Sequence, residues 1–282
     1  MGRIADFNCT YDHASGFGTW ASEDYGIAFP QGYSEREMIA QLALAVQEHD
    51  GMCFCQLPFC HTLEAEALGG NVRLGDGVSG PRMSGYICRT IEEVQEHLYS
   101  LQRKNHKLIE HRRVQETLAA CRMLKKQGKS VLFVVSGPMT ILNGLVDSEI
   151  LFRALLKKPE LMDQIFEMLG QEILEMMKLA EEAGADAISY ADPSGGINIV
   201  GPKVAARITE KFTLGFLKNV DRKLKKDTPV VLCPKTAFAL IGTELAEWKD
   251  RQLAEEMDYA EAVEDLKGKI RFVGQNCIKN TG

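Results

Sequence analysis

The chain has 282 residues, of which 45% are hydrophobic and 26% charged, a composition typical of a globular protein with a substantial core. Its net charge of -6 argues against nucleic acid as a partner, and no stretch approaches the roughly 20 apolar residues of a membrane span. The first residues lack the apolar segment of a secretory leader, and the 8 cysteines are therefore interpreted as reduced thiols of a cytoplasmic protein.

The N-terminal part of the chain is predicted to hold an irregular arm, a helix and a short strand. Residues 1–30 show no clear period and are interpreted as the irregular arm. Ser34 followed by Glu37 matches a capping box, which predicts that a helix begins there. The apolar run at 52–59 predicts a short buried strand, and the Gly-rich residues 69–85 predict a loop.

The rest of the chain alternates predicted helices and strands. Residues 91–124 are expected to be helical in two or three segments, and Pro159 is expected to begin a long helix. Strands are expected at 130–135, at 186–191 and in two apolar runs that close with Cys233 and Cys277. This alternation implies parallel βαβ units, and the length suits one (β/α)8 TIM barrel domain over residues 1–282.

Only five strands stand out clearly, and the last lies close to the final residue. Either early strands lie within the irregular regions, or the barrel is shortened or incomplete. An incomplete barrel would expose strand edges, which a homodimer would cover.

Candidate catalytic residues follow three of the predicted strands, at the carboxyl ends where α/β proteins bind ligands. His61 and Glu64 follow the first strand; alternatively, Glu64 caps a helix with Thr62 and His61 is an ordinary structural histidine. Gly and Pro in the turn 136–140 allow a close approach to a ligand, although a plain turn explains them equally well. Asp192 ends a further strand and suits an anchor or acid/base role, but Asp before Pro is also common in turns.

Two thiols at strand ends, Cys233 and Cys277, form a candidate zinc site because thiolates are favoured zinc ligands. The alternative is that each is a buried structural thiol. No Walker loop, GxGxxG, HExxH or GxSxG is present, which removes the usual nucleotide, metalloprotease and hydrolase interpretations.

Several motifs together resemble the uroporphyrinogen decarboxylase superfamily, and most of all its corrinoid branch, the methylcobamide:coenzyme M methyltransferases. The resemblance spans roughly residues 50–240 and implies a (β/α)8 barrel with its site at the C-terminal rim. Its motifs, in chain order, are LPFCHTLEAEALGGNV, SGPMTILNGL, KKPELMDQIFEML, EEAGADAISYADPSGG and VVLCPKT.

The resemblance also implies a set of metal ligands. In the methyltransferase branch, a His-x-Cys at a strand end and a later Cys bind zinc, and a thiolate takes a methyl group from a methylated corrinoid. Cys233 matches the Cys of His-x-Cys and Cys277 is a candidate for the later one, but Val231 stands where the family has histidine. Zinc takes about three protein ligands in such sites, and His61, Glu64 or Asp192 are candidates for the third.

The sequence therefore predicts a corrinoid-dependent methyltransferase. It would move a methyl group between a methylcobamide on a corrinoid protein and a small thiol or folate-like acceptor. Asp192, His61 and Glu64 would be the catalytic residues and Cys233 and Cys277 the zinc ligands. The alternatives are a uroporphyrinogen decarboxylase-type carboxy-lyase, whose arginine-rich N-terminal motif is missing here, and a non-catalytic corrinoid-binding relative.

Overall fold

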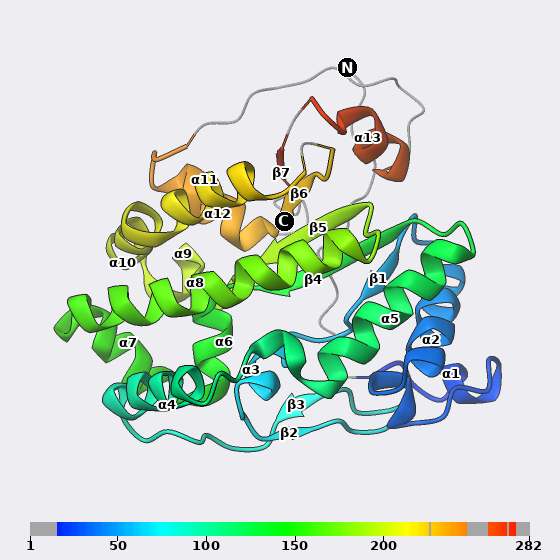
Figure 1. Cartoon of the computed structure of the whole chain (residues 1–282), viewed down its shortest axis with the longest axis horizontal. Coiled ribbons are helices and arrows are strands. Elements are labelled where there is room, and N and C mark those ends of the chain that lie inside the picture. The colour runs from blue at the N-terminus through cyan, green and yellow to red at the C-terminus, as the bar shows by residue number, and fades with distance from the viewer. Residues whose placement is uncertain (1–15, 226, 247–258, 270, 275–282) are drawn as a thin grey trace.

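A parallel sheet forms the centre of the computed structural model, which describes residues 16–225, 227–246, 259–269 and 271–274. Its five described strands lie side by side in chain order and pair in parallel throughout (Figure 1). They are β1 (Cys55–Leu57), β4 (Val131–Ser136), β5 (Ala187–Ala191), β6 (Val230–Leu232) and β7 (Phe272–Gly274). All five predicted strand regions are confirmed, the last of them by β7, and Cys277 lies outside the described residues.

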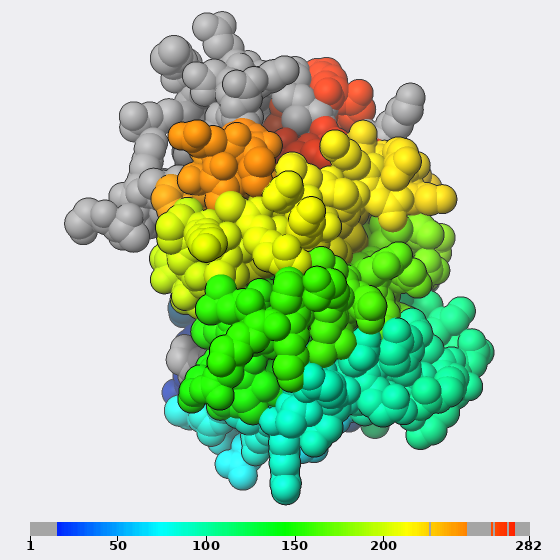
Figure 2. Space-filling view, turned by 90° about the vertical axis from the view of Figure 1, so that its left-hand side faces the viewer, coloured from blue at the N-terminus to red at the C-terminus, as the bar shows by residue number. Residues whose placement is uncertain are grey.

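Long helices connect the strands and cover one face of the sheet, which we call the outer face. The helix α2 packs against β1, α5 against β1 and β4, and α8 against β4 and β5 (Figure 1). In Figure 2, successive segments from cyan to orange form neighbouring bands across the molecule. The longer helices are α2 (Arg36–His49), α4 (Ile91–Arg103), α5 (Arg112–Lys126), α7 (Ser148–Lys157), α8 (Pro159–Glu182) and α11 (Leu214–Lys223).

Shorter elements fill the connections between these helices and strands. Those before β4 are α1 (Trp20–Glu23), η2 (Gln31–Tyr33), α3 (Leu63–Ala67), the antiparallel pair β2 (Val72–Arg73) and β3 (Arg82–Met83), and η3 (Leu108–Glu110). Those after it are α6 (Pro138–Leu145), η4 (Pro193–Gly195), α9 (Ile197–Val200), α10 (Pro202–Ile208), the π-helical η5 (Thr209–Thr213), α12 (Pro234–Gly242) and α13 (Tyr259–Leu266).

Sequential parallel strands with helices on the outer face are the arrangement of a (β/α)8 barrel, whereas a doubly wound sheet reverses its strand order. The predicted fold class is therefore confirmed, and the described strands form an open sheet rather than a closed ring. That residues 1–282 make one domain stays a prediction. None of the described helices combines the length and the hydrophobicity of a membrane-spanning segment.

Burial on both faces explains why the strands are continuous apolar runs instead of alternating ones. On the outer face, Phe133 and Tyr190 belong to the main core beneath the helices. On the opposite, inner face, Leu132, Ala187 and Val231 share a second apolar cluster. Each strand therefore sends alternate side chains into two separate apolar layers.

The helix that begins near Ser34 is present, but the predicted capping box is wrong. The helix α2 begins at Arg36, its N-cap residue is Glu35 and no side chain makes a cap hydrogen bond. The Ser34 hydroxyl instead donates to the carbonyl of Pro30. The Arg36 amide donates to the carboxylate of Glu116 on α5 at 2.9 Å, so a distant residue replaces the local cap.

The remaining predictions for helices and loops agree with the structure. Residues 91–124 form α4, η3 and most of α5, and Pro159 is the first residue of α8. The Gly-rich stretch 69–85 is largely loop but contains the short β2–β3 pair. Residues 16–30 hold only the one-turn helix α1, as expected of the irregular arm.

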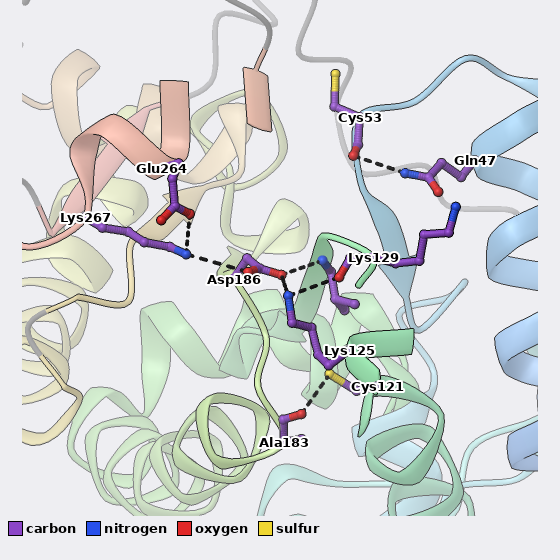
Figure 3. A network of polar contacts seen from close by, with 10 residues as sticks. Gln47, Cys53, Cys121, Lys125, Lys129, Ala183, Asp186, Glu264 and Lys267 are labelled. Carbon is purple, nitrogen blue, oxygen red and sulfur yellow. Dashed lines mark hydrogen bonds and ion pairs between the residues drawn. The ribbon is translucent and has the colours of Figure 1, made fainter. Parts of the chain in front are cut away.

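An ionic network fixes the amino ends of the strands (Figure 3). Asp186, just before β5, accepts from the Lys125 ammonium at 2.6 Å and from the Val131 amide at 2.8 Å. Lys267 lies 3.6 Å from the other oxygen of the same carboxylate and also pairs with Glu264. This network joins α5, β4, β5 and α13 at the end of the sheet away from the predicted site.

Candidate functional site

Glu64 lies in α3, fully buried, and reaches from the end of β1 to the end of β4. One carboxylate oxygen accepts a 2.7 Å hydrogen bond from the Ser136 amide, and the other has no partner within the described residues. Thr62 occupies the N-cap position of α3, but its side chain makes no cap hydrogen bond. The capping alternative therefore fails, and Glu64 instead ties two neighbouring strand ends together.

Asp192 follows β5 and binds the first turn of α6. Its Oδ1 accepts from the Thr140 amide at 2.8 Å and the Thr140 hydroxyl at 2.9 Å, and its Oδ2 accepts from the Met139 amide at 3.3 Å. Burial raises the pKa of Asp192 to about 6, although these hydrogen bonds act in the opposite direction. The carboxyl is thus poised to change protonation in the weakly acidic range.

The turn after β4 accommodates Asp192 because residue 137 is glycine. The Gly137 amide donates to the Ala191 carbonyl at 2.7 Å, which joins the ends of β4 and β5. On the other side, the Asp192 amide donates to the Thr236 hydroxyl at 2.9 Å. Hydrogen bonds therefore run without interruption from Glu64 across the ends of β4 and β5 to α12.

Cys233 is the N-cap residue of α12 and lies on the inner face, 2% exposed, beside Val134 and Ala191. Its amide donates to the Tyr190 carbonyl at 2.9 Å. Val231, two residues earlier, points to the same face but is sealed in an apolar cluster. The segment that corresponds to the His-x-Cys motif therefore offers the sulfur of Cys233 but no imidazole at residue 231.

Within the described residues, no group of three or more His, Cys, Asp or Glu side chains could hold a metal ion. The described donors alone therefore do not fit zinc, which takes about three protein ligands in an open site. Cys277, the second predicted ligand, lies outside the described residues.

His61 borders a pocket of about 250 Å³ at the carboxyl ends of the strands. Its Nδ1 is buried without a hydrogen-bond partner in the described structure. Pro193 and Ser194, which follow Asp192, form part of the same pocket, so the structure brings His61 and the Asp192 turn to one cavity. The other lining residues are Thr62, Pro81, Arg82, Met83, Thr140, Asn143 and Gly144.

A buried arginine binds residues that lie next to the pocket, and the sequence did not predict it. The guanidinium of Arg113, on α5, donates to the Glu66 carboxylate at 2.5 Å, the Tyr33 carbonyl at 2.8 Å and the Cys60 sulfur at 2.9 Å. The Cys60 sulfur also lies 3.1 Å from the hydroxyl of Thr62, which lines the pocket. The arginine is the second residue of α5, where the sequence offers no signal for such a role.

Comparison with known proteins agrees with this fold. The model of the uroporphyrinogen decarboxylase (URO-D) family matches residues 20–275. The methylcobamide:CoM methyltransferase MtaA of Methanosarcina barkeri is 24% identical over 257 residues, covering 89% of this chain and 72% of that protein. The methylcobamide:CoM methyltransferase MtbA of Methanosarcina acetivorans is 25% identical over 224 residues. These residues cover 77% of this chain and 62% of MtbA.

A solved structure supports the same fold. A methyltransferase from Methanosarcina mazei superposes with a TM-score of 0.64 at 20% identity, covering 85% of this chain and 68% of that one. The similar curated proteins are methyltransferases, which supports an enzyme of that class. The resemblance inferred from the sequence motifs is confirmed, because the family match covers most of the chain: the protein belongs to the uroporphyrinogen decarboxylase family.

Proposed function

We propose that this protein transfers a methyl group between a methylated corrinoid carried by a partner protein and a small acceptor, a thiol or a folate-like compound. Supporting this proposal are the similar proteins, which are named as methylcobamide:CoM methyltransferases. The structural observation that carries it is the pocket at the strand ends, bordered by His61 and by the turns that Glu64 and Asp192 hold.

Transfer to a thiol needs a site that positions the sulfur and accepts its proton. The sulfur attacks the methyl carbon, a carbon–sulfur bond forms, and the cobalt–carbon bond breaks with both electrons left on cobalt. The thiol proton leaves to a base or to water, since the thiolate is the nucleophile. The site must also remain open to the corrinoid ring carried by another protein. A pocket at the carboxyl ends of the strands fits this requirement.

The three predicted catalytic residues would divide this work. His61 borders the pocket and would meet the acceptor directly. Glu64 and Asp192 would act as positioning residues, because their carboxylates bind backbone amides of the turn that forms the pocket wall. Loss of either carboxylate would let this turn move. A displacement of about 1 Å would misalign the acceptor and lower the rate about 100-fold.

Zinc bound by Cys233 and Cys277 is a separate part of the proposal. When bound, zinc would favour the thiolate form of a coordinated thiol. Metal analysis of the freshly purified protein is the test: zinc should be present in the wild type and lost in Cys233→Ala. Cys121→Ala is the control. Cys121 is also buried, but it lies in α5 and its sulfur donates to the Ala183 carbonyl. A wild type without zinc would overturn the zinc assignment and leave methyl transfer to be judged by its own assay.

The transfer assay uses free methylcobalamin as the donor with coenzyme M, mercaptoethanol or tetrahydrofolate as acceptor. We expect loss of the methylcobalamin absorbance and a methylated product by mass spectrometry, with Asp192→Asn reduced at least tenfold. Asp186→Asn, at the opposite end of the strands, is the control and should retain activity. No methyl transfer to any acceptor by folded protein, with release of carbon dioxide from uroporphyrinogen instead, would overturn the proposal.

A further inference from the structure

Two pockets lie side by side at the carboxyl ends of the strands. The pocket beside His61 measures about 250 Å³, and a second one measures about 370 Å³. Asn143, Pro193 and Ser194 line both, so the two cavities adjoin across these residues. We call the two pockets together the rim cleft.

Each pocket of the rim cleft has one Arg or Lys among its described lining residues. Arg82, on β3, lines the first pocket and Lys235, in the first turn of α12, lines the second. Among the described residues, no Asp or Glu lines either pocket. This is notable in an acidic chain with 39 Asp and Glu against 33 Lys and Arg.

No ion pair within the described residues neutralises either cation. Many other basic side chains, such as Arg103 and Lys158, pair with a carboxylate. The acidic residue whose pKa responds to Arg82 is Asp76, but its carboxylate accepts hydrogen bonds from the amides of Val78 and Ser79. Within the described structure, Arg82 and Lys235 therefore line the cleft without a carboxylate bound to them.

The residues that the two pockets share, Asn143, Pro193 and Ser194, carry no charge. Asn143 lies on the shared wall, and the Thr62 and Thr140 side chains lie on the side of Arg82. Beside Lys235 the wall includes the apolar side chains of Phe152 and Ile199. A ligand that spans the cleft would thus meet a cation at each end, a hydrogen-bonding amide in the middle and an apolar surface next to Lys235.

We propose that the rim cleft binds a small molecule with two anionic groups, one held by Arg82 and the other by Lys235. Carboxylates fit this arrangement, because a guanidinium binds them through two parallel hydrogen bonds and an ammonium binds them as a point charge. The proposal rests on the proposed function only in taking this molecule to be the methyl acceptor; the binding itself requires no corrinoid.

Calorimetric titration of the full chain tests the proposal with a ladder of probes. Succinate, glutarate, adipate and pimelate are compared with the monocarboxylates of equal chain length, from butyrate to heptanoate. We expect one dicarboxylate to bind at least tenfold more tightly than its monocarboxylate, with affinity that falls as salt rises. Arg82→Ala and Lys235→Ala should each remove about tenfold, which brings the dicarboxylate to the level of its monocarboxylate.

Arg103→Ala is the control, because this arginine is also exposed but lies at the end of α4. Equal binding of both acid series, a loss in only one of the two cleft variants, or an equal loss in Arg103→Ala would overturn the proposal. Methyl transfer to uncharged mercaptoethanol is measured in parallel. Transfer without dicarboxylate binding refutes the cleft alone, whereas dicarboxylate binding without transfer to any acceptor refutes the methyltransferase proposal alone.

Discussion

Gly137 and Asp192 lie so close that a Cβ atom added to the glycine would come within 2.4 Å of the Asp192 Cβ and 2.5 Å of its Cγ. Gly137→Ala must therefore displace the aspartate from the first turn of α6. We expect it to lower the free energy of unfolding by about 1–3 kcal/mol, as overpacking does, and to reduce methyl transfer more than tenfold. Urea unfolding and the transfer assay measure the two effects.

Gly215→Ala provides the control for this substitution. Gly215 lies in α11, and an added Cβ would meet nothing within 4 Å. Because alanine favours helix over glycine by about 1 kcal/mol, this variant should be as stable as the wild type or more so. Equal behaviour of the two variants would contradict the assigned role of Gly137.

The stability of the protein should depend on pH through Asp192. Its pKa is raised from 3.8 to about 6, so the folded state holds its proton at pH values where the unfolded state has already lost it. The contribution is therefore full below about pH 4, falls as pH rises to about 6, and amounts to on the order of 3 kcal/mol. Asp192→Asn cannot titrate here, so the difference in unfolding free energy between variant and wild type should change across this window. A constant difference would contradict the raised pKa.

Arg113 should be needed for stability because its guanidinium donates hydrogen bonds to Tyr33, Cys60 and Glu66 at once. Arg113→Met would leave the Glu66 carboxylate, 20% exposed, without its ionic partner, and we expect a loss of about 3 kcal/mol in urea unfolding. The double variant with Glu66→Gln should lose less than the two single variants combined, because the stranded charge is then gone. Arg36→Met is the control: its exposed pair with Glu116 should contribute less than about 1 kcal/mol. Additive losses in the double variant would show that the pair is not coupled.

Stability and activity should separate at the other end of the strands. Asp186→Asn removes the charge that faces Lys125 and Lys267, and we expect a loss of about 1–2 kcal/mol. Methyl transfer below the unfolding temperature should remain within twofold of the wild type, since the site lies at the carboxyl ends. A large drop in turnover by folded Asp186→Asn would refute this separation.

The sequence predicts those parts of the fold that depend on local pattern. The run 130–135 is apolar throughout because β4 is buried on both faces, and Pro159 fits the first turn of α8 because that position needs no amide donor. Glu64 and Asp192 could be identified as rim residues because each follows such a strand. Their bonding to the backbone turn between them could not be predicted, because it depends on the register of neighbouring strands.

Contacts between segments far apart in the chain could not be predicted from the sequence. The first amide of α2 is satisfied by Glu116, 80 residues away, so a local capping pattern gave the wrong result. Arg82 comes from a Gly-rich stretch that shows no chemistry in the sequence, and Lys235 stands beside Cys233 without any pattern that marks it. Only the folded chain brings these two cations to adjoining pockets.

The rim is bonded largely through main-chain donors, and this affects how far such a sequence can diverge. Ser136, Met139 and Thr140 each offer a backbone amide to a carboxylate, and the Asp192 amide binds Thr236. A backbone donor persists whatever side chain evolution places there, proline apart. The geometry of the rim can therefore outlast most of the identities along it, while the side chains that face the ligand drift toward new specificities.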